Sequence, residues 1–155
     1  MAWAKLATKT LTSAGTNVTT DTFTASKFMT VLFNSIDPSN SDEPYRTRLN
    51  SDATSNYYSR RSSLNGAADA TDVADHISLG IGTAVPSFCI EYWVNISTEE
   101  KLCIMFYVEQ NTTTSSYAPN RREYVGKWVN TSNQITTYEK SFATRTFATD
   151  TNATV

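Results

Sequence analysis

The sequence predicts an all-β protein, an antiparallel β-sandwich of about eight strands with jelly-roll-like connections. Two runs rich in β-branched and aromatic residues flank the polar break Ser97–Glu100 within the segment Ser87–Gln110. Their alternation with a period of two is typical of half-buried strands, and the break suits a hairpin loop. The chain also contains 25 Thr and 17 Ser among 155 residues, and β-branched Thr favours strands. Turn signals separate the remaining apolar runs without crossover helices, which indicates two packed antiparallel sheets.

Apolar runs elsewhere place the other strands of the sandwich. The near-continuous apolar run that begins at Phe28 predicts a strand covered on both faces. The Thr-rich tail after Phe142 is expected to add a last strand at the edge of a sheet. Besides the hairpin, the expected strands are Trp3–Leu11, Val18–Thr24, Phe28–Ile36, Tyr45–Asn50, Ile77–Ile81, Arg121–Asn130 and Gln134–Phe142.

Residues 1–155 are expected to form a single domain, because this length is sufficient for one hydrophobic core. Residues 51–76 form a long polar surface segment within that domain. Within this segment, Tyr57–Arg61 is expected to form a short strand. Ala67–His76 is expected to form a helical turn, because its alanines and an Asp near its start favour a helix N-terminus.

The two cysteines are predicted to be free thiols. If Ile96 pairs with Leu102 across the hairpin, Cys103 lies opposite Asn95, which is six residues from Cys89. At ~3.3 Å per residue the two thiols are too far apart for a disulfide, which requires Cα atoms about 4.4–6.8 Å apart. Free thiols indicate synthesis in a reducing compartment.

Charge and hydropathy limit the classes of partner. Thirteen basic and 15 acidic residues give a formal net charge of -2, so no nucleic-acid partner is expected. The N-terminus lacks a charged region followed by an apolar run, so no signal peptide is expected. No stretch approaches the ~20 apolar residues that span a bilayer, so no membrane partner is expected.

The sequence shows no enzyme motif. It contains no Gly-x-Ser-x-Gly and no phosphate-binding glycine loop. Asp69, Asp72 and Asp75 recur every third residue but do not follow a calcium-loop pattern, so they are interpreted as capping acids of a solvated loop. His76 is the only histidine and has no second ligand at zinc spacing. We therefore expect no catalytic residue, no metal and no cofactor.

One face of the central hairpin is a candidate interface. Cys89, Glu91, Trp93, Met105 and Tyr107 are expected to lie on the exposed face, which is too apolar for water. Aromatic and Met residues are enriched in interfaces, and a large exposed apolar patch usually has a partner. Two explanations stay open: a neighbouring subunit covers this face, or a second layer of the same domain does.

Two arginine pairs, Arg60-Arg61 and Arg121-Arg122, are the other candidate contacts. A guanidinium group suits carboxylates on a neighbouring subunit, whereas the alternative is a local ion pair, such as Arg122 with Glu123 or Glu91. The residues assigned to a subunit interface are therefore Trp93, Met105, Tyr107, Arg60, Arg61, Arg121 and Arg122. A different possibility is that Trp3, Trp93 and Trp128, with the eight tyrosines, form a strip on which sugar rings stack.

Three stretches of the chain resemble a known group of proteins. They are Met1-Ala2-Trp3-x-Lys5-Leu6, Val94–Leu102 and Ala118–Ile135, the last of which contains Asn-Arg-Arg-Glu-x-Val-Gly-Lys-Trp. Together they resemble small proteins of tailed phages and environmental, largely marine, viruses, most of which have no assigned function. The resemblance covers most of the chain except the Thr-rich tail. It implies a viral structural component and no catalytic residues.

These observations predict a non-enzymatic virion structural protein that assembles in many copies on a phage particle, in the capsid, as capsid decoration or in the tail. Its expected partners are copies of itself and other virion proteins. It is expected to be synthesised in the host cytoplasm and to end in the virion. The alternative is a carbohydrate- or receptor-binding β-sandwich module, whose partner is a glycan on the host surface.

Overall fold

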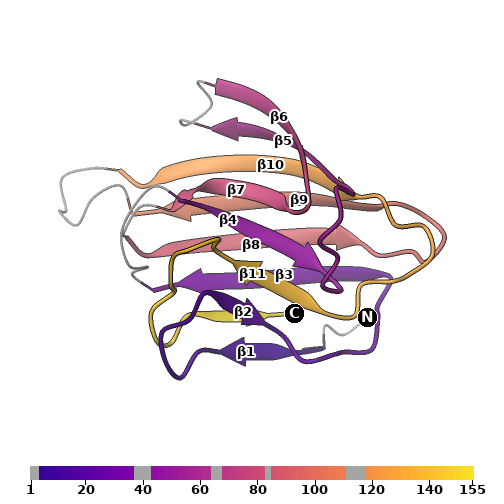
Figure 1. Ribbon diagram of the computed structural model, residues 1–155, viewed down its shortest axis with the longest axis horizontal. Coiled ribbons are helices and arrows are strands. Elements are labelled where there is room, and N and C mark those ends of the chain that lie inside the picture. Colours follow the sequence, from indigo (N-terminus) through magenta and orange to yellow (C-terminus); the bar gives the residue numbers. More distant parts are fainter. Residues whose placement is uncertain (1–3, 37–42, 64–67, 83–84, 111–117) are drawn as a thin grey trace.

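The computed structural model describes residues 4–36, 43–63, 68–82, 85–110 and 118–155. Within these ranges the chain forms twelve strands and no helix, arranged in two antiparallel sheets (Figure 1). The larger sheet has the order β1-β12-β3-β8-β9-β10-β5-β6, and the smaller has the order β2-β11-β4-β7. The protein is therefore an all-β antiparallel sandwich, as predicted, but the described residues form twelve strands rather than about eight, because several of them are short pairings that local alternation does not reveal.

The strands are short at the termini and long in the middle of the larger sheet, where β3, β8, β9 and β10 lie side by side (Figure 1). Their bounds are β1 Thr8–Thr10, β2 Asn17–Thr19, β3 Phe28–Ser35, β4 Glu43–Leu49, β5 Tyr57–Ser63, β6 Ala68–Ala74, β7 Ile77–Gly82, β8 Ser87–Val94, β9 Lys101–Glu109, β10 Asn120–Trp128, β11 Tyr138–Ser141 and β12 Asn152–Thr154.

The core lies between the two sheets, because alternate residues of the facing strands point inward. Strand β3 contributes Val31 and Phe33, both fully buried, and β4 contributes Tyr45 from the opposite sheet. Phe147 stacks on Tyr45 with ring centroids 5.8 Å apart. The same ring meets Phe33 edge-on at 5.5 Å. This aromatic cluster joins the two layers at the centre of the sandwich.

The central hairpin is confirmed, but its register differs from the expected one by two residues. Cys89 lies opposite Tyr107, and Cys103 lies opposite Trp93. The cysteines are therefore four residues apart along the strands rather than six. Both are free, as predicted, and both are buried, although Cys89 was expected on the exposed face of the hairpin.

Strand β3 is not covered on both faces, contrary to expectation. Its residues alternate strictly, with Met29 and Val31 buried and Phe28 and Leu32 exposed. The smaller sheet covers only the inner face of the larger one, so the apolar side chains on the other face of β3 remain at the surface.

Residues 51–76 form more sheet than the sequence predicts. The short strand at Tyr57–Arg61 is confirmed and extends to Ser63 as β5. The helical turn expected at Ala67–His76 is wrong, because Ala68–Ala74 pairs with β5 as strand β6. The hydrogen bonds offered by β5 outweigh the local helix preference of the alanines. These two strands widen the larger sheet beyond β10 (Figure 1).

The C-terminal tail forms a strand but not an edge strand. Strand β12 lies between β1 and β3, with Thr154 opposite both Thr8 and Leu32. The expected first strand, Trp3–Leu11, contracts to Thr8–Thr10 at the edge, and Trp3 lies outside the described residues. The last expected strand contracts to Tyr138–Ser141, because side chains hold the residues before it. The Asn50 carboxamide oxygen, for example, accepts from the backbone N–H groups of Thr136 and Thr137.

Candidate functional site

The face of the larger sheet that points away from the smaller one, here called the outer face, carries the apolar residues exposed by the described part of the chain. Strict alternation along β8 and β9 turns one residue in two toward this side. Eleven large apolar side chains are exposed in the described ranges, and all of them belong to the outer face. They are Phe28, Leu32, Tyr58, Val73, Phe88, Tyr92, Leu102, Ile104, Phe106, Val108 and Val125.

Cross-strand pairing makes these side chains neighbours. Tyr92 lies opposite Ile104, and Ile104 lies opposite Val125. One step along the strands, Phe106 lies opposite Ile90, and Ile90 lies opposite Leu32. Side chains that are directly opposite in antiparallel strands have Cβ atoms about 4.5–5.5 Å apart. The apolar residues therefore form one continuous surface across β3, β8, β9 and β10.

The exposed apolar area is large for a single chain. Leu102, Ile104 and Phe106 are 53%, 50% and 48% exposed at the centre of the outer face. Eleven large side chains at about this exposure present on the order of 1,000 Å² of surface, against roughly 300–600 Å² for the largest apolar patch of a typical monomer. An apolar surface of this size marks a site of interaction.

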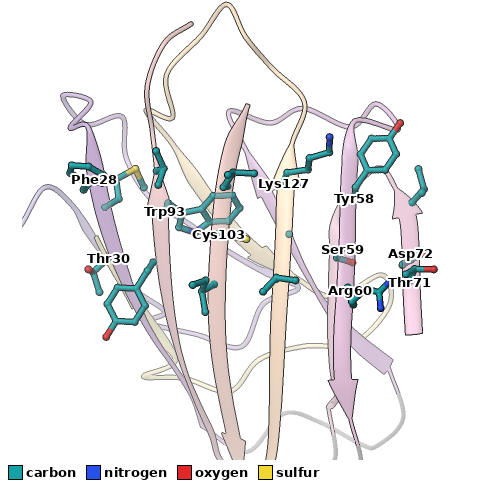
Figure 2. Close-up of a pocket in the computed structure, with 18 residues that line it drawn as sticks. Phe28, Thr30, Tyr58, Ser59, Arg60, Thr71, Asp72, Trp93, Cys103 and Lys127 are labelled. Atoms are coloured by element: carbon teal, nitrogen blue, oxygen red, sulfur yellow. The ribbon is translucent and has the colours of Figure 1, made fainter. Parts of the chain in front are cut away.

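Part of the outer face is hollowed into a groove of about 770 Å³. Figure 2 shows Phe28 on one side of this groove and Tyr58 on the other, with the central strands between them. Aliphatic side chains of β9 and β10, among them Leu102, Ile104 and Val125, line the groove between these rings. The lining is mainly apolar, so the groove suits an apolar occupant rather than a highly hydroxylated one.

Charged residues occupy the β10–β5–β6 side of the outer face, and they are paired within the chain. Lys127 Nζ lies 2.7 Å from Glu100 Oε2 and 5.3 Å from the centre of the Tyr58 ring. Arg60 Nη1 lies 2.9 Å from Asp69 Oδ2 across the β5–β6 pair. These pairs place both signs of charge beside the apolar surface, and neither sign dominates.

The prediction that Trp93, Met105 and Tyr107 lie on the exposed face was wrong. They are 1%, 0% and 2% exposed and face the smaller sheet. Of the two explanations that the sequence left open, the second layer of the same chain covers them. The polar members of that face have their own partners. Tyr107, for example, donates a 2.8 Å hydrogen bond to Glu109 Oε2.

Glu91 is held inside the sandwich by several donors. Lys140 Nζ lies 2.6 Å from Glu91 Oε1, and the exposed fractions of the two side chains are 1% and 0%. Trp93 Nε1 donates to Glu91 Oε2 at 2.9 Å, and the Tyr138 hydroxyl donates to Oε1 at 2.7 Å. A charge that is paired and hydrogen-bonded in this way tolerates burial. This network joins the sheets and offers no surface to a substrate.

The four predicted interface arginines are not brought together on one surface. Arg60 belongs to the outer face, with Asp69 as its partner. Arg121 is also on the outer face and lies 3.9 Å from Glu123. Arg122 and Arg61 alternate with them and lie on the inner side of the sheet, since Arg61 pairs with the buried Tyr124.

The local ion pair proposed for Arg122 has a different partner from those expected. Arg122 Nη2 lies 3.3 Å from Glu109 Oε1 on the neighbouring strand, and the two side chains are 11% and 1% exposed. Neither Glu123 nor Glu91 is this partner, because Glu123 points to the outer face and Glu91 binds Lys140.

The acidic residues of β6 do not converge. Asp69 and Asp72 lie on opposite faces, because a spacing of three residues on a strand changes face. Asp75 follows the strand and binds Arg48 and His76, with 2.5 Å between Asp75 Oδ1 and His76 Nδ1. Across the described ranges, no group of three or more His, Cys, Asp or Glu side chains is arranged to hold a metal ion.

The apolar residues of the outer face are recognisable in the sequence, but they were expected to face the core. Phe88, Ile90, Tyr92 and Val94 are the most uniformly apolar set in the hairpin, which made them the natural candidates for burial. The set with Glu91 is the buried one instead, because Lys140 on β11 supplies the ion-pair partner. That partner is 49 residues away in the chain, so local alternation does not reveal it.

No family model, no curated protein and no solved structure matches this chain. In the part of the chain that the structure describes, no helix is long and apolar enough to cross a membrane.

Proposed function

We propose that this chain is a non-enzymatic structural component of a virus particle, present in many copies in the capsid, as capsid decoration or in the tail. The observation that carries the proposal is the outer face, to which all eleven exposed large apolar side chains of the described residues belong. A chain that functions alone would expose such a surface to water, whereas a component of an assembly buries it. The viral setting rests on the resemblance carried by the three sequence stretches described above.

The polar groups of the sandwich support a structural role. The densest cluster, Glu91 with Lys140, Tyr138 and Trp93, is buried between the sheets. It therefore stabilises the packing of two layers rather than meeting a small molecule. The charges on the outer face are paired with neighbours in the same chain, as is usual for the rim of a protein contact.

Mass spectrometry of purified particles of the encoding virus tests this proposal. We expect peptides of this chain in the particles, at a copy number comparable to that of the major structural proteins. A matched sample of host lysate treated with the same purification serves as the control. Particles that lack the chain, or contain it only at the level of the lysate control, contradict the proposal.

A second candidate is a module that binds a carbohydrate or a receptor on the host surface. Tyr58 and Tyr92 favour it, because these residues are 42% and 46% exposed at the groove and sugars stack on aromatic rings. However, Trp93 and Trp128 are buried, and the aliphatic lining offers few hydrogen bonds to hydroxyl groups. A glycan array distinguishes the two: binding that Tyr92→Ala abolishes favours this candidate, and no binding removes it.

A further inference from the structure

We infer that the outer face is the contact between two copies of this chain, which pair sheet against sheet. The inference rests on the proposed function, because it names the partner in the assembly. Unlike the proposed function, the pairing of two copies can be measured on the purified protein alone. The size of the surface, its width and its charges support a second copy as the occupant.

The area of the outer face matches what a stable dimer needs. The exposed apolar side chains present on the order of 1,000 Å², and a stable protein–protein contact buries about 800 Å² on each partner. A second copy brings an equal apolar surface, so both patches are removed from water together. An isologous pair of this kind, in which the same surface is used twice, is the commonest form of oligomer.

The width of the surface favours a sheet over a helix or an extended peptide as the occupant. The apolar surface covers β3, β8, β9 and β10, and neighbouring strands are about 4.8 Å apart. Four strands and their flanks therefore extend over roughly 15–20 Å. A helix is only about 10–12 Å across, so a single helix leaves much of the surface exposed. The outer face of a second copy covers the full width.

The charges beside the surface permit self-association. Lys127 with Glu100, Arg60 with Asp69 and Arg121 with Glu123 form three ion pairs within the chain, and Lys27 lies over the Phe28 ring, 5.7 Å from its centre. Because most of these charges are already paired, two identical faces meet with little net repulsion. A partner selected by charge would require a larger excess of one sign.

Sedimentation of the purified full chain over a range of concentrations tests the inference. We expect a dimer with twice the mass of one chain, and we expect Ile104→Lys to weaken its association by about 100-fold or more, since each dimer then buries two unpaired lysines. Thr10→Lys is the matched control, because Thr10 is exposed in the same sheet but on strand β1, away from the apolar strands. It should leave the association unchanged.

The folded state of each variant is checked by circular dichroism. Ile104 is half exposed, so its replacement should leave the monomer folded. If Ile104→Lys does not fold, Ile104→Thr retains the β-branched side chain and should still weaken the association by about 10-fold.

Cross-linking locates the contact independently. Residues near the centre of a two-fold contact approach their own copies, so Ile104→Cys should form a disulfide-linked dimer on mild oxidation, whereas Thr10→Cys should not. The native thiols do not interfere, because Cys89 and Cys103 are buried.

Three outcomes overturn the inference: a monomer at every concentration, a dimer unaffected by Ile104→Lys, or equal cross-linking at positions 104 and 10. A monomeric protein that is still found in particles refutes only the self-pairing, because another virion protein then covers the outer face. A dimeric protein that is absent from particles refutes only the proposed function.

Discussion

Lys140 and Glu91 show how single residues select which face of the hairpin is buried. The pair has a separation of 2.6 Å, and Lys140 also donates to Thr47 Oγ1 at 2.7 Å. The ammonium group lies 5.4 Å from the centre of the Phe33 ring, so it contacts an aromatic face as well. Each charge in this network has a partner, and that is what makes its burial acceptable.

Replacing one member of this pair should destabilise the protein strongly. Lys140→Met leaves Glu91 buried without its cation, and we expect the free energy of unfolding to fall by about 3–5 kcal/mol. The double variant Lys140→Met with Glu91→Gln removes both charges and should recover a large part of the loss. Urea unfolding of the parent, the two single variants and the double variant measures the coupling free energy between Lys140 and Glu91. A Lys140→Met variant as stable as the parent would contradict the assignment.

The two thiols should be unreactive in the folded protein. Burial raises the pKa of Cys89 to about 12 and also raises the pKa of Cys103. The thiolate is the reactive form. At pH 8, a thiol reagent should therefore label neither residue in the time in which it labels a solvent-exposed cysteine. In denaturant, both should react. Fast labelling of a thiol in the native protein would show that the interior is accessible.

At the scale of elements, β10 depends on a glycine that permits close packing. A Cβ atom at Gly126 would lie 2.9 Å from Ile77 Cδ1 on β7 and 3.2 Å from both Cys103 Sγ and the backbone oxygen of Tyr58. Three elements therefore converge on this position. The absence of a side chain allows the smaller sheet to approach β10 at the point where the two sheets meet.

Gly126→Ala should therefore destabilise the fold. We expect a loss of about 1–3 kcal/mol from overpacking, measured as a lower midpoint in urea. Gly15→Ala is a suitable control, because a Cβ atom there has no heavy atom closer than 3.9 Å. Equal midpoints for the two variants would contradict the close approach of β7 to β10.

The elements also differ in how well the sequence predicted them. The hairpin was found almost to its observed bounds because period-two alternation persists along both strands, and Phe28–Ser35 was found because its apolar run is nearly continuous. Ala68–Ala74 was missed, because its alanines and aspartates favour no strand by themselves. Pairing with β5 supplies the backbone hydrogen bonds that local preference does not.

At the scale of the whole molecule, eight strands face four, so one side of the larger sheet has no cover within the described chain. If two copies cover each other there, the dimer stabilises each fold by mass action. The melting temperature should then rise with protein concentration, and Ile104→Lys should remove this dependence. A melting temperature that is independent of concentration in the parent would agree with the monomer outcome described above.

The sheet class, the hairpin and the free thiols could be predicted from the sequence, because alternation, β-branched composition and strand spacing are local properties of the chain. The buried face of the hairpin could not be predicted in this way. Both faces are apolar enough to be a core, and the choice depends on Lys140, Tyr138 and the smaller sheet, which reach Glu91 from distant parts of the chain. Because the smaller sheet covers Trp93, Met105 and Tyr107, the candidate interface is the outer face, on the opposite side of the larger sheet.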